Sequence, residues 1–122
     1  MSHADYPDGD ALVPASFDLH TVILLVRPAD APAFGDDELN RLQDQHLGYL
    51  RELARRGVLV ANGPLADQTD ERLRGISVYA APLDEALELA RADPMVRAGR
   101  LAIDGARWFT ASGTARFGTD PA

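Results

Sequence analysis

The segment 22–26, with the sequence VILLV, limits the fold more than any other part of the chain. Its residues are β-branched or leucine, and Pro28 closes the run. Short runs of this composition are typical of buried strands, so we expect a strand from Leu19 to Arg27. Side chains alternate between the two faces of a strand, which makes both faces of this strand apolar.

The other elements are expected from apolar periodicity and from residues that start or stop helices. A long helix is predicted from Asp36 to Arg56, with Asp36 or Asp37 as its N-cap and Gly57 as its C-terminal stop. After it we expect a strand at 58–61 with a turn at Asn62-Gly63-Pro64, a strand at 73–80, a helix from Pro82 to about Ala92 and a strand from about Arg100 to Phe109 with a bulge or bend at Gly105.

This βαββαβ order predicts an α+β, ferredoxin-like fold: one antiparallel four-stranded sheet with two helices on one face. The chain of 122 residues suits one domain, which we place at residues 18–111. Residues 1–17 and 112–122 are rich in small and polar residues, so we expect an N-terminal tail and a C-terminal tail that are flexible or loosely docked.

Two helices can cover only one face of the sheet, yet the first strand and the segment 58–60 are apolar on both faces. The second face would be a contiguous exposed patch, which monomers seldom tolerate. A homodimer that packs two sheets face to face removes the patch. The alternative is that a tail folds over it.

Charge and composition exclude several kinds of partner. The net charge is -7, and all 12 basic residues are arginine, in no cluster along the sequence dense enough to overrule the negative field. We therefore expect no binding to nucleic acid or to a membrane surface. Cysteine is absent, which excludes disulfides and thiolate zinc sites and fits a cytoplasmic protein. No histidine–carboxylate spacing suggests a metal site.

Of the three histidines, His46 is the candidate for chemistry. His3 lies in the tail, and His20 is expected to be structural. His46 lies in the middle of the long helix, on the face that otherwise carries leucines. It must be hydrogen-bonded within the core or open into a pocket between helix and sheet.

The other candidates have ordinary structural interpretations as well. Asp93 precedes Pro94 and can simply organise the helix exit, and Gly63-Pro64 can be an ordinary turn. Trp108 is expected to fill the core or a dimer interface.

Several segments together resemble the YciI-like (YCII-related) family. They are QHLGYL at 45–50, GVL at 57–59, NGPL at 62–65, DEA at 84–86 and ADP at 92–94. The resemblance implies a dimeric α/β barrel with a paired histidine and aspartate, here His46 and Asp93, and with Tyr49, Gly63 and Pro64 as substrate-binding residues. One branch of the family dehalogenates a chlorinated hydroxyhydroquinone, and most members have no assigned reaction.

A histidine–aspartate pair suits proton transfer, because a free imidazole titrates at a pH of about 6.5 and a carboxylate fixes its tautomer. The leading hypothesis is a lyase- or hydrolase-like enzyme that needs no cofactor and acts on a small polar or aromatic metabolite. The alternative is a non-catalytic dimer that binds a small ligand. Monooxygenase or haem chemistry would rest on fold analogy alone.

Overall fold

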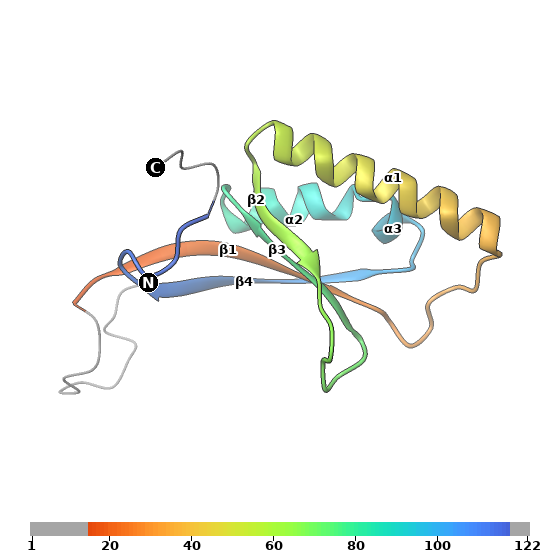
Figure 1. Cartoon of the computed structure of the whole chain (residues 1–122), viewed down its shortest axis with the longest axis horizontal. Helices are drawn as coiled ribbons and strands as arrows, with labels where there is room; N and C mark the ends of the chain where they lie inside the picture. The colour runs from red at the N-terminus through yellow and green to blue at the C-terminus, as the bar shows by residue number, and fades with distance from the viewer. Residues whose placement is uncertain (1–14, 118–122) are drawn as a thin grey trace.

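The protein is a four-stranded antiparallel sheet with helices on one side, as Figure 1 shows for the computed structural model, which describes residues 15–117. Its elements are β1 (Phe17–Val26), α1 (Asp36–Arg55), β2 (Leu59–Pro64), β3 (Leu73–Tyr79), α2 (Leu83–Arg91), α3 (Pro94–Arg97) and β4 (Ala102–Ala111). This order confirms the predicted ferredoxin-like fold and adds the short helix α3. The predictions for residues 1–14 and 118–122, including His3, lie outside the described residues.

The strand order in the sheet is β2-β3-β1-β4, so the apolar strand β1 lies inside the sheet. It pairs with β3 on one side and with β4 on the other, both antiparallel. Ile23, opposite Ser77 on β3 and Gly105 on β4, is fully buried. The apolar run of β1 thus fits the position of this strand inside the sheet.

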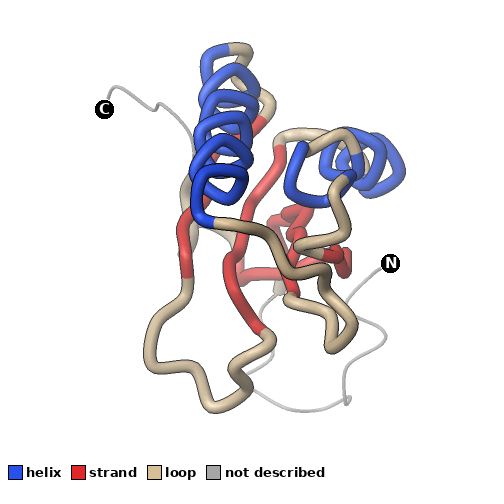
Figure 2. The backbone as a smooth tube through the Cα atoms, turned by 90° about the vertical axis from the view of Figure 1, so that its right-hand side faces the viewer, coloured by secondary structure: helices blue, strands red, loops and turns tan. Residues whose placement is uncertain are grey.

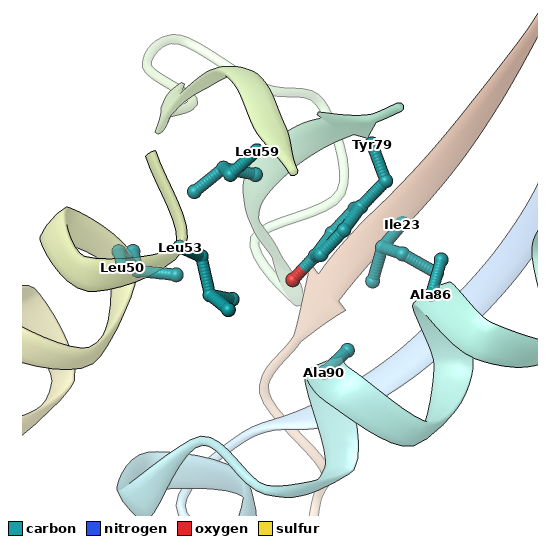
Figure 3. Packing of buried hydrophobic residues seen from close by; sticks show 7 residues of the cluster. All are labelled: Ile23, Leu50, Leu53, Leu59, Tyr79, Ala86 and Ala90. Atoms are coloured by element: carbon teal, nitrogen blue, oxygen red, sulfur yellow. The ribbon is translucent and has the colours of Figure 1, made fainter. Parts of the chain in front are cut away.

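Both long helices lie on the same side of the strands, as Figure 2 shows with helices in blue. The helix α1 packs against β2 and α3, and α2 packs against β1 and β4. Figure 3 shows the core between them, with Leu50, Leu53, Leu59, Tyr79, Ile23, Ala86 and Ala90. The small residues Ala86 and Ala90 let α2 approach the sheet closely.

Gly105 makes room for α2, because a Cβ atom at this position would lie 2.9 Å from Cδ2 of Leu87 and 3.0 Å from Cδ1 of Leu83. The predicted bulge at Gly105 is wrong, since β1 and β4 pair without a register shift from Phe17 to Val26. Glycine is needed here for close packing.

Two local predictions about the ends of elements are also wrong. The N-cap of α1 is Gly35, without a side-chain cap, although Asp36 and Asp37 lie in the first turn as expected. The predicted turn at 62–64 is instead the end of β2, paired with β3. Proline has no backbone N–H to donate, and Pro64 is tolerated there because β2 is an edge strand. The predicted end of the second helix at about Ala92 is confirmed, and Asp93-Pro94 at once begins the additional helix α3.

The segment after β4 returns to the start of β1. The amide of Gly113 donates to Oδ2 of Asp18 at 2.8 Å, and the ring of Phe117 lies 5.0 Å from the ring of His20. His20 Nε2 is 3.0 Å from Oγ1 of Thr110, as a structural histidine would be. Trp108 contacts both rings yet stays 43% exposed, so it does not fill the core, and its alternative place in a dimer interface stays a prediction.

Between residues 15 and 117, no helix has the length and apolarity needed to cross a membrane.

Candidate active site

A pocket of about 240 Å³ lies where α1, the β2–β3 pair and α3 meet. It is lined by Leu25, Arg27, Gln43, His46, Leu47, Leu50, Asn62, Gly63, Pro64, Arg74, Gly75, Ile76, Ser77, Met95 and Leu101. The walls are mostly apolar, with a small number of polar side chains. Pockets of this composition bind small molecules, and this volume suits a small metabolite.

His46 forms the centre of the polar part. The apolar face of α1 turns it inward together with Leu50 and Leu53, and 8% of the residue remains exposed. Its Nδ1 lies 2.7 Å from Oδ2 of Asp93, 47 residues further along the chain. The two predicted residues thus meet at hydrogen-bond distance, which is the geometry that an imidazole–carboxylate pair needs.

Each oxygen of Asp93 has its own partner. Oδ2 accepts from His46, and Oδ1 accepts from the backbone N–H of Met95 at 2.9 Å, which caps α3. The carboxyl group is 2% exposed, so it depends on both donors. One oxygen of Asp93 thus caps α3 at the exit from α2, and the other holds the imidazole of His46.

This arrangement fixes the tautomer of the imidazole. An ionised carboxylate only accepts hydrogen bonds, so Nδ1 carries the proton and Nε2 of the neutral ring holds the lone pair. Within residues 15–117, Nε2 has no hydrogen-bond partner, and no buried side-chain nitrogen or oxygen lacks one. Nε2 is therefore accessible, on a ring that lines the pocket.

Two tyrosines lie close to the negative charge of Asp93. Burial raises the pKa of Tyr79 to about 12, with smaller contributions from Tyr49 and Asp93. The pKa of Tyr49 is raised by burial first and by Asp93 second. Figure 3 shows the Tyr79 hydroxyl pointing into the space between α1 and α2. Both hydroxyls therefore stay protonated at neutral pH.

Two of the three predicted substrate-binding residues line the pocket, and the third does not. Gly63 and Pro64 line the pocket, at the end of β2. Tyr49 does not line it, and its hydroxyl donates to the carbonyl oxygen of Leu89 on α2 at 2.8 Å. Tyr49 thus holds α1 against α2.

Sequence reasoning missed several polar residues of the pocket: Arg27, Gln43, Asn62, Arg74 and Ser77. Gln43 precedes His46 by three residues on α1, so helical spacing could have indicated it. Asn62 adjoins Gly63 and Pro64, which the family resemblance indicates. Arg27 directly follows β1, and Arg74 and Ser77 lie on β3, so only the pairing of these two strands brings the three to the pocket.

No group of three or more metal-binding side chains occurs among the residues that the structure describes.

Fold and site together define a small α+β domain with a histidine–aspartate pair at a pocket. The histidine lies on α1, and the aspartate lies between α2 and α3. The family of YCII-related domains matches residues 21–104 of this chain. The match covers more than half of the chain, so the chain belongs to the YCII-related family, which confirms the resemblance seen in the sequence.

Comparison with curated proteins gave no match. Among solved structures, a similar one is 5-chloro-2-hydroxyhydroquinone dehydrochlorinase from Burkholderia phenoliruptrix AC1100 in complex with 2,5-dihydroxybenzoquinone. It is 23% identical, with a TM-score of 0.49, and the alignment covers 75% of this chain and 93% of that chain.

Proposed function

We propose that the chain is a cofactor-independent enzyme in which His46 is the general base and Asp93 is its orienting partner. The observation that carries the proposal is that the two ring nitrogens differ. Nδ1 is held by Asp93 at 2.7 Å, and Nε2 has no partner among residues 15–117, on a ring that lines the pocket. The reaction class is lyase- or hydrolase-like proton transfer on a small polar or aromatic metabolite.

The chemistry follows from this difference between Nδ1 and Nε2. Nε2 takes a proton from the substrate or from a water molecule, and the imidazolium that forms is stabilised by the carboxylate of Asp93. Asp93 cannot turn away, because its second oxygen is held by the amide of Met95. General acid–base help of this kind contributes about 10²–10⁴ to a rate.

The pocket walls supply the remaining requirements. Gly63 and Pro64 place backbone close to the pocket, and the apolar residues Leu47, Leu50 and Met95 keep water away from a small substrate. We include Gly63 and Pro64 as substrate-binding residues. Tyr49 contributes by fixing the position of the helix that carries His46.

Proton exchange provides a test in which the product need not be identified. Small keto acids and hydroquinones are incubated with the protein in D₂O, and loss of carbon-bound protons is followed by ¹H NMR. We expect wild type to accelerate exchange for at least one compound, and His46→Gln to lower that rate by roughly 10²–10⁴. His20→Gln is the matched control, because His20 bonds Thr110 and does not line the pocket.

Equal exchange rates for wild type and His46→Gln would refute the role of His46. If wild type accelerates no compound but still binds one, the alternative function is favoured, a non-catalytic dimer that binds a small ligand. That alternative uses the same pocket without proton transfer.

Two expectations about the surroundings of the chain also stay proposals. We propose a homodimer that covers the sheet face opposite the helices, where Leu24 pairs with Ile76 and both are half-buried. Sedimentation equilibrium tests it: a mass near that of the 13.2 kDa monomer would contradict it. The absence of cysteine is the support for a cytoplasmic location.

A further inference from the structure

Three arginines from distant parts of the chain come together beside the pocket. Arg27 follows β1, Arg74 lies on β3, and Arg100 lies between α3 and β4. Nε of Arg27 donates to the carbonyl oxygen of Arg100 at 3.0 Å, and Arg27 and Arg74 both line the pocket that contains His46. Positive charge thus gathers at this point in a chain whose net charge is -7.

Among residues 15–117, no carboxylate forms an ion pair with these three guanidinium groups. Arg41, Arg55 and Arg72, by contrast, pair with Glu38, Glu52 and Asp70. The side chains of Arg27, Arg74 and Arg100 instead donate to the backbone carbonyl oxygens of Arg100, Glu71 and Pro32. Asp70, on the loop before β3, accepts two hydrogen bonds from the guanidinium group of Arg72.

The mutual repulsion of these charges is visible at Arg27. Its pKa is lowered, first by burial and then by the positive charges of Arg100 and Arg74. Arg74 lies at a register shift of the sheet, where Leu25 pairs with Gly75 but Val26 pairs with Leu73. Such irregularities turn a side chain away from its regular direction and are common beside binding sites. An anion between the guanidinium groups would relieve the repulsion.

We propose that the pocket binds a small organic monoanion, with its negative charge at Arg27 and Arg74 and its apolar body against Leu47, Leu50 and Met95. This inference deepens the proposed function and rests on it for the role of the pocket, since it names the class of substrate that would be presented to His46. The pocket volume of about 240 Å³ suits an acid with few carbon atoms beyond its charged group.

The experiment compares an anion with a neutral molecule of the same size. Benzoate is paired with benzamide, and butyrate with butyramide, which separates an aromatic from an aliphatic acid. Affinities for the full chain are measured by NMR chemical-shift titration at low salt. We expect at least one acid to bind roughly tenfold more tightly than its amide, the factor of about one charge-assisted hydrogen bond. Added salt should reduce this preference.

The variants Arg27→Gln and Arg74→Gln should each remove most of the preference for the acid and leave amide binding unchanged. Arg74 is exposed, so its substitution keeps the test decisive if Arg27→Gln does not fold. Arg41→Gln is the control, because Arg41 lies on the exposed face of α1 and pairs with Glu38. The inference would be overturned if neither acid binds more tightly than its amide. It would also be overturned if Arg74→Gln keeps the preference of wild type.

Binding and proton transfer can fail separately. A His46→Gln variant that keeps its preference for the acid, while wild type shows no proton exchange, would support the anion site and refute the proposed enzyme. Proton exchange by wild type with no preference for acids would support the proposed enzyme and refute the anion site.

Discussion

The pair of His46 and Asp93 can be tested through stability alone, without a substrate. Asp93→Ala removes two hydrogen bonds at once, one to the imidazole and one to the amide of Met95. Removing one partner of a buried pair costs about 3–5 kcal/mol. Loss of an N-cap costs about 1 kcal/mol. We therefore expect Asp93→Ala to lower the free energy of unfolding by roughly 4 kcal/mol, towards the limit of what a small domain tolerates.

Asp93→Asn separates the two bonds. The amide oxygen of asparagine can still cap α3, because asparagine is among the best N-cap residues. Its amide nitrogen is a donor, so the bond to the imidazole survives only if Nδ1 of His46 becomes the acceptor. We expect a loss of about 1–2 kcal/mol, smaller than for alanine. Asp84→Asn on the exposed face of α2 should change stability by less than about 0.5 kcal/mol.

The assay is a double-mutant cycle of His46→Ala and Asp93→Ala, measured by urea unfolding at neutral pH and at one protein concentration. Residues in contact show coupling energies of about 0.5–3 kcal/mol, and a pair this close and buried should lie in the upper half. Effects that add to within about 0.5 kcal/mol would refute the pair, whatever the distance between the atoms.

Three further predictions concern the core and the ionisation of a tyrosine. With the pKa of Tyr79 raised to about 12, the unfolded chain loses its tyrosine proton first, at a pH of about 10. The free energy of unfolding should therefore fall by up to about 3 kcal/mol as the pH rises between these values, and urea unfolding of Tyr79→Phe should lack this fall. Gly105→Val should cost about 1–3 kcal/mol, because a Cβ atom already meets Leu87. Gly48→Ala, where the helix surface is open, should instead stabilise by about 0.5–1 kcal/mol, so equal signs in thermal unfolding would contradict the packing argument. Leu53→Ala should cost about 2–5 kcal/mol in urea unfolding, since Leu53 is fully buried, and a value no larger than that of the exposed residue Leu47 would be inconsistent with the core in Figure 3.

The fold could be predicted because its elements carry strong periodic signals. The buried residues of α1 are His46, Leu50 and Leu53, all on the predicted face. The apolar run at 22–26 predicted a buried strand, and β1 lies between β3 and β4. Periodicity of this kind reports burial directly, so it survives errors of one or two residues at the ends.

Local signals failed where tertiary pairing was stronger. Asn62-Gly63-Pro64 has the composition of a turn, but hydrogen bonding to β3 extends β2 through it. Asp36 and Asp37 have good cap side chains, yet the chain enters α1 through the extended backbone of Gly35. At 62–64 the neighbouring strand β3, which local sequence does not reveal, decided the conformation.

The site was only half visible in the sequence. His46 was conspicuous as an ionisable residue among leucines, and Asp93 came from the family resemblance and not from spacing. The three arginines could not be found together, because 47 residues separate Arg27 from Arg74 and a further 26 separate Arg74 from Arg100. Charge clusters that form only on folding leave no pattern along the chain.

The pocket is assembled from segments that run from Leu25 to Leu101, so it exists only when the whole domain is folded. Any molecule that occupies it must therefore stabilise the entire native state. At a concentration 100 times its dissociation constant, such a molecule adds about 2.7 kcal/mol. In a domain of this size that raises the melting temperature by about 10 °C. Thermal denaturation across a metabolite library can thus find the natural ligand before any reaction is known.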